Sequence, residues 1–130
     1  AAAILERLRR RRAAKTGARG GEGELAAARR LLEGTAYARA FAAEQDKAPF
    51  LAYHAPAEGH GGEGSSKELV TEHWTRADLL RLAWRAACAL CARAIVPGST
   101  HAHYFSGNAV EDVALRLAAA MLRTVPVTVN

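Results

Sequence analysis

The sequence predicts a mostly α-helical protein: a small helical bundle with an N-terminal basic arm, a Gly-rich loop and an extended C-terminal tail. Apolar residues recur at helical spacing over 76–95 and 109–123. Capping signatures precede both segments, and much of the apolar half of the chain is alanine, the strongest helix former. We expect these two helices to form an antiparallel hairpin, with a third helix over 22–46 packed across it.

Residues 1–21 form the predicted arm, and residues 22–130 form a single helical domain. The first thirty residues hold nine basic and three acidic side chains, a net charge of +6. The other hundred hold nine basic and ten acidic side chains, a net charge of −1, so the overall +5 is a local feature. A helix is expected over about 2–16, and Gly17 and Gly20 end it.

The arm carries the predicted nucleic-acid contacts. Guanidinium groups make bidentate contacts with phosphate and stay charged in any environment. No aromatic residue precedes Tyr37, so the arm lacks the stacking side chains that read bases, and contact with the phosphate backbone fits better. The residues expected to make these contacts are Arg7, Arg9, Arg10, Arg11, Arg12, Lys15 and Arg19.

The first half of the domain contains one long predicted helix and one loop. Helix 22–46 begins with acidic residues and contains the i,i+4 aromatic pair Tyr37 and Phe41, although Gly34 weakens its middle. A short extended apolar patch follows at 50–53. The composition of residues 54–66 predicts a flexible Gly-rich loop.

Capping signatures predict where the helices begin in the second half of the domain. Ser65 and Glu68 predict a short helix that ends near His73, and Thr75 with Asp78 opens the apolar helix 76–95, which Pro97 and Gly98 end. Residues 99–107 read as a polar loop.

A third signature starts the last helix. Asn108 with Glu111 opens helix 109–123, on which Asp112 and Arg116 can pair at i,i+4. The tail from Val125 is β-branched, and Pro126 restricts it to an edge strand that pairs with patch 50–53 or with another chain.

Two cysteines and two histidines are weak candidates for a metal site. Cys88, Cys91, His101 and His103 have the order and number of a tetrahedral zinc set. The single residue between the histidines is too short a spacing, however. The cysteines lie within an apolar helix, where small thiols commonly fill core space. We therefore expect no metal or other cofactor, and we find no catalytic signature.

These observations favour a non-catalytic structural subunit of a larger assembly. The leading hypothesis is a ribonucleoprotein component of the ribosomal-protein type, which contacts RNA phosphates through its arm and has neighbouring protein subunits. The alternatives are a helical protein–protein adaptor without nucleic acid and a small zinc-binding or enzymatic module. The two closely spaced cysteines fit an intracellular reducing compartment, an organelle such as the mitochondrion included. The sequence contains no apolar run of transmembrane length.

Overall fold

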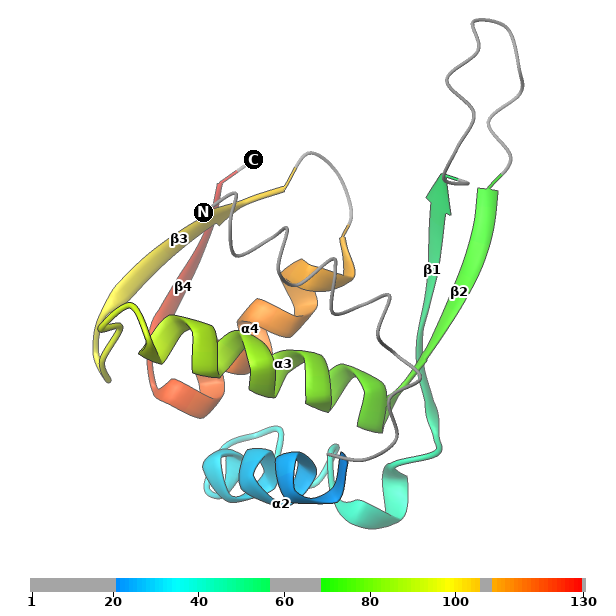
Figure 1. Cartoon of the computed structure of the whole chain (residues 1–130), viewed down its shortest axis with the longest axis horizontal. Coiled ribbons are helices and arrows are strands. Elements are labelled where there is room, and N and C mark those ends of the chain that lie inside the picture. Colours follow the sequence, from blue (N-terminus) through cyan, green and yellow to red (C-terminus); the bar gives the residue numbers. More distant parts are fainter. Residues whose placement is uncertain (1–20, 57–68, 106–108, 130) are drawn as a thin grey trace, which may run out of the picture.

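The computed structural model describes residues 21–56, 69–105 and 109–129, and over these ranges the fold is mixed α/β (Figure 1). The prediction of a mostly helical bundle is therefore wrong, because two antiparallel and two parallel strands accompany the helices. In chain order the elements are α2 (Gly21–Leu32), the 3-10 turn η1 (Ala43–Gln45), β1 (Pro49–Pro56), β2 (Leu69–Thr75), α3 (Arg76–Cys91), β3 (Thr100–Tyr104), α4 (Val110–Leu122) and β4 (Val125–Val129).

Helix α2 ends much earlier than the predicted boundary at residue 46. Gly34 adopts a φ of +75°, a left-handed conformation that favours glycine. Thr35 then folds back, because its backbone N–H and its hydroxyl both donate to the Leu32 carbonyl, at 3.0 and 2.6 Å. Gly34 is thus a helix terminator rather than a weak point within a longer helix.

Strands β1 and β2 form an antiparallel hairpin that projects from the body (Figure 1). The predicted short helix ending near His73 is wrong over residues 69–73, which belong to β2. This segment holds Val70, Thr71 and Trp74, and β-branched and aromatic residues favour strands when a partner strand is present. Strand β1 supplies that partner and extends through Pro56, so the predicted loop does not begin at residue 54. The Ser65 capping signature lies outside the described residues.

Helix α3 occupies the centre of the molecule. Its predicted start is confirmed: the Thr75 hydroxyl accepts a hydrogen bond from the Asp78 N–H, and the Asp78 carboxylate accepts one from the Thr75 N–H. The helix ends at Cys91 rather than at residue 95. Ala94 takes a left-handed φ of 59° there, and the Ile95 N–H donates to the Leu90 carbonyl, as in a Schellman ending.

The last three elements form a β–α–β unit. Strands β3 and β4 pair in parallel, from Thr100 opposite Val125 to Tyr104 opposite Val129, and α4 is the crossover between them. The expected polar loop at 99–107 is therefore largely a strand. Helices α3 and α4 do pack against each other, but they do not form a simple helical hairpin because β3 lies between them in the chain. The edge-strand prediction for the C-terminal tail is correct, but its partner is β3 rather than patch 50–53.

The start of α4 is only partly described. Its N-cap position is Ala109, whose side chain makes no capping bond, and Asn108 lies outside the described residues.

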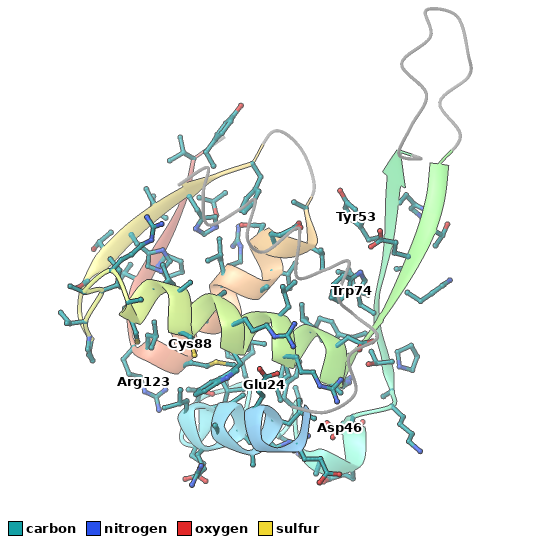
Figure 2. All side chains as sticks on the ribbon, viewed as in Figure 1. Glu24, Asp46, Tyr53, Trp74, Cys88 and Arg123 are labelled. Carbon is teal, nitrogen blue, oxygen red and sulfur yellow. The ribbon has the colours of Figure 1, made fainter. Side chains whose placement is uncertain are left out.

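The core forms where α2, α4 and the root of the hairpin meet α3 (Figures 1 and 2). The predicted apolar stripes are mostly correct, and the wholly buried large side chains are Leu32, Leu79, Leu80 and Val110. Many of the other buried positions are alanines, which let the helices approach closely but bury little area each. Trp74 closes the core at the base of β2. No helix in the described ranges is long and apolar enough to cross a membrane.

Candidate functional site

Strand β3 turns its two histidines inward and Thr100, Ala102 and Tyr104 outward. Along Thr100–Tyr104 exposure alternates, so that His101 and His103 face the inside of the molecule and Ala102 and Tyr104 face outward. Phe105 continues the inward series and packs against the core. This order is the reverse of the usual strand pattern, in which apolar residues point to the core.

His103 joins both strands of the parallel sheet to α4. Its Nε2 lies 2.6 Å from Oδ1 of Asp112 and 3.4 Å from the Thr128 hydroxyl. Arg116 completes the group, because its Nε donates to Oδ2 of Asp112 at 3.2 Å and its Nη2 donates to the Thr128 hydroxyl at 2.7 Å. The Asp112–Arg116 pair predicted from i,i+4 spacing is therefore confirmed, and it belongs to a network that fixes α4 over the inner face of the sheet.

The same inner face holds a second histidine. Burial, and then the neighbouring His103, lowers the pKa of His101 below its ordinary value. Within the described part of the chain, Nε2 of His101 and Nδ1 of His103 are buried without a hydrogen-bond partner. The side chain of His103 is only 8% exposed, and its Nε2 pairs with the Asp112 carboxylate. This arrangement is typical of a structural contact, here one that holds β3 against α4.

A cavity of about 490 Å³ lies between strand β1 of the hairpin and the network residues Asp112, Arg116 and Thr128. Its volume is within the range of small-molecule sites. Its polar lining contains His54, Asp112, Arg116 and Thr128, and each of these side chains already makes a hydrogen bond within the fold. The lining residues are Leu51, Ala52, Tyr53, His54, Phe105, Ala109, Val110, Asp112, Val113, Arg116 and Thr128.

The outer face of the β3–β4 sheet is uncharged and open. Tyr104 is 60% exposed, and the three valines of β4 are 41–53% exposed. With Thr100 and Ala102, they form a surface that we call the outer sheet face: Thr100, Ala102, Tyr104, Val125, Val127 and Val129. Parallel sheets are normally covered on both faces, and among the described elements only the inner face has a helix over it. The outer sheet face is therefore the clearest candidate for an interaction surface.

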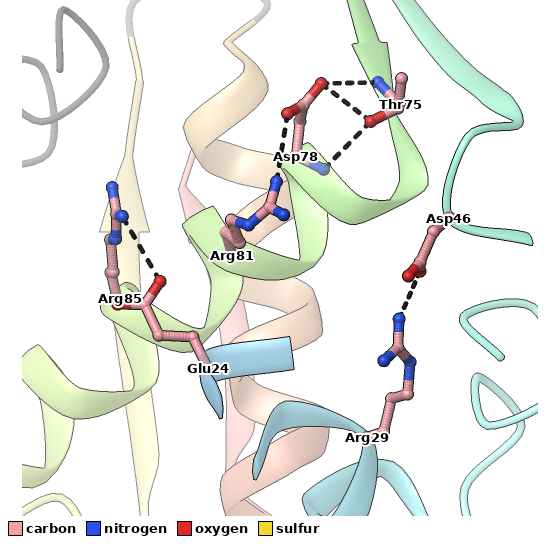
Figure 3. Close-up of polar contacts among 7 residues, drawn as sticks. All are labelled: Glu24, Arg29, Asp46, Thr75, Asp78, Arg81 and Arg85. Carbon is pink, nitrogen blue, oxygen red and sulfur yellow. Dashed lines mark hydrogen bonds and ion pairs between the residues drawn. The ribbon is translucent and has the colours of Figure 1, made fainter. Parts of the chain in front are cut away.

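The predicted arm residues, from Arg7 to Arg19, lie outside the described residues. In the body, three arginines of α2 and α3 make internal ion pairs (Figure 3). Arg85 contacts Glu24 at 3.4 Å, Arg81 contacts Asp78 at 3.7 Å, and Arg29 pairs with Asp46. Arg81 and Arg85 are therefore engaged in ion pairs within the fold.

The four weak metal candidates do not come together. Cys88 and Cys91 are exposed on α3 and form no disulfide, so the expectation that they fill core space is wrong. His101 and His103 lie under the sheet instead. No group of three potential metal-ligating side chains occurs in the ranges that the structure describes.

Sequence reasoning named His101 and His103 only as weak metal candidates and missed both their inward placement and the outer sheet face, because it treated residues 99–107 as a loop. The unused signal was a period of two over 100–104, where histidine alternates with small or aromatic residues. The same period at Val125, Val127 and Val129 did predict the C-terminal strand.

Comparison with known proteins assigns the chain to no family. The chain matches no family model, no curated protein and no solved structure. Its function is therefore argued from its own residues.

Proposed function

We propose that this protein is a non-catalytic structural subunit of a larger assembly, a ribonucleoprotein in which the arm contacts RNA phosphates and the body contacts a neighbouring protein. The observation that carries the proposal is the open outer sheet face. A two-stranded sheet is marginal by itself, and a parallel one is normally covered on both sides. A neighbouring subunit would supply the missing cover.

The charge distribution supports RNA as the second partner. Residues 1–21 hold seven basic side chains and one acidic side chain, a net charge of +6, whereas residues 22–130 carry a net charge of −1. In the body, Arg29 and Arg85 form ion pairs with Asp46 and Glu24. A cluster of arginines that neutralises phosphates releases counterions, so its binding weakens steeply with salt.

A salt titration of RNA binding tests this role for the arm. The first variant replaces Arg9, Arg10, Arg11 and Arg12 with glutamine in the full chain. A loss of four phosphate contacts lowers the slope of log K against log salt by about 3, since each contact to a single strand contributes about 0.7.

The control variant carries the same change of charge on the body. It replaces Arg30, Arg39, Lys47 and Arg93, which are all exposed, with glutamine. We expect its slope to stay close to that of the unmodified chain. Equal slopes for the two variants would remove the arm from the proposal.

The outer sheet face also favours a second candidate, a protein–protein adaptor without nucleic acid. Nuclease treatment of the native complex separates the two functions. Partners that remain bound after complete RNA digestion, together with an absence of RNA in the untreated complex, would support the adaptor. Release of the partners by nuclease would support the ribonucleoprotein subunit.

A further inference from the structure

The two open edges of the parallel sheet differ in what they offer to another strand. The Val125 N–H donates to the Ser99 carbonyl at 2.8 Å, and the register pairs Thr100 with Val125. In a parallel ladder, successive residues direct their backbone groups to opposite edges. His101 and His103 therefore bond toward β4, whereas Thr100, Ala102 and Tyr104 direct their N–H and C=O groups to the far edge of β3. No other described strand pairs there.

The far edge of β4 is closed to a full ladder. By the same alternation, Pro126 and Thr128 direct their backbone groups to that edge. Pro126 has no N–H, so a strand added beside β4 would lose a hydrogen bond at that position. Proline at an edge is one of the devices by which proteins prevent unwanted strand pairing.

The edge of β3 has none of these protections. Strand β3 contains no proline and no lysine, arginine or carboxylate, and its register with β4 contains no bulge. The side chains beside this edge, Thr100, Ala102 and Tyr104, belong to the outer sheet face. A strand added here would gain backbone hydrogen bonds and extend an uncharged apolar surface at the same time.

We propose that β3 accepts an extended segment of a partner protein as a third strand, with apolar, uncharged side chains on its outer side. This inference rests on the proposed assembly role and specifies the protein contact in it. The outer sheet face offers apolar area on the order of a few hundred Å². This is less than the roughly 800 Å² per partner of a stable interface between folded surfaces. Backbone hydrogen bonds to an added strand supply the binding free energy that packing on the outer sheet face does not provide.

A second copy of the chain fits this site less well than a partner segment. Each copy carries a net charge of +5, so two copies repel one another. The outer sheet face contributes no charge that could offset this repulsion, because its six side chains are all neutral. A partner strand with uncharged side chains avoids that cost.

The test uses a synthetic eight-residue peptide of alternating valine and threonine and follows backbone amide hydrogen exchange in the full chain. Binding as a third strand protects the amides of Ala102 and Tyr104, while those of His101 and His103 already bond to β4. A peptide N-methylated on its pairing edge is the chemical control, and it should bind at least tenfold more weakly.

The decisive variant is Ala102→Pro. It removes one edge donor in the way that Pro126 already does on β4, where the same sheet tolerates proline, so the fold should persist. We expect an unchanged circular dichroism spectrum and at least a tenfold loss of peptide affinity. Val96→Lys is the matched control, since Val96 is 56% exposed but lies outside the sheet, and its affinity should not change.

Three results would overturn the proposal. The first is a peptide that leaves the exchange rates of Ala102 and Tyr104 unchanged. The second is an Ala102→Pro variant that folds and binds the peptide normally. The third is a chain that sediments as a dimer with these amides protected before any peptide is added, which would make a second copy the occupant. The salt dependence of RNA binding is measured separately, so failure here leaves the arm's proposed role standing.

Discussion

The capping box at the start of α3 provides a quantitative test of how local sequence stabilises this fold. The Thr75 hydroxyl accepts from the Asp78 N–H at 3.2 Å and donates to the Asp78 carboxylate at 2.8 Å. Thr75→Ala removes both contacts. Loss of a threonine N-cap costs about 1 kcal/mol of unfolding free energy. With a urea m-value of about 2 kcal/mol/M, the unfolding midpoint should fall by about 0.5 M.

Equilibrium urea unfolding, followed by circular dichroism, measures this shift. Thr75→Ser retains the hydroxyl and should unfold near the wild-type midpoint. The double variant with Asp78→Ala should lose less free energy than the two single variants together, because the side chains act as a pair. Arg81→Gln isolates the partly exposed ion pair to Asp78, which contributes little to the free energy of unfolding. A serine variant that unfolds as early as the alanine variant would refute the hydroxyl's role.

Three further perturbations probe the core, a helix end and the inner histidine. Leu80→Ala, at a wholly buried position, should cost about 2–5 kcal/mol in urea unfolding, whereas Leu31→Ala, at a 37% exposed position, should cost under about 1 kcal/mol. Ala94→Gly should raise the urea midpoint, because glycine relieves the left-handed φ of 59°, and an unchanged or lower midpoint would contradict this. The lowered pKa of His101 means that folding favours its neutral form, so stability is present above about pH 6.5 and falls as pH drops through the window below it. His101→Leu should flatten that fall between pH 7 and 5, while exposed His73→Asn should keep it.

Local signals predicted the later helices well. The Thr75 capping box, the apolar face of α3 and the bounds of α4 within about one residue all follow from contacts between residues three or four apart. Such contacts can be predicted from the sequence directly, because the residues that make them are close in the chain. The same holds for the Asp112–Arg116 pair, which lies one helical turn apart.

The strands were harder to predict because their partners lie far away in the chain. Residues 69–75 become β2 because β1, about twenty residues earlier, offers a ladder. Val125 finds its partner in Thr100 only after α4 has carried the chain back across the sheet. A five-residue alternation such as 100–104 carries little weight by itself, and here its inward side chains are histidines rather than the apolar residues that usually identify a strand.

The sequence by itself determined the concentration of positive charge in the first thirty residues, the alanine-rich helices and their caps, since each depends on neighbouring residues. Only the tertiary structure decided which residues form the interaction surface. Pairing β3 with β4 turned two histidines inward, where Asp112 meets one of them, and left tyrosine and three valines outward. Long-range strand register sets which face a side chain occupies, and a shift of one residue would reverse every face.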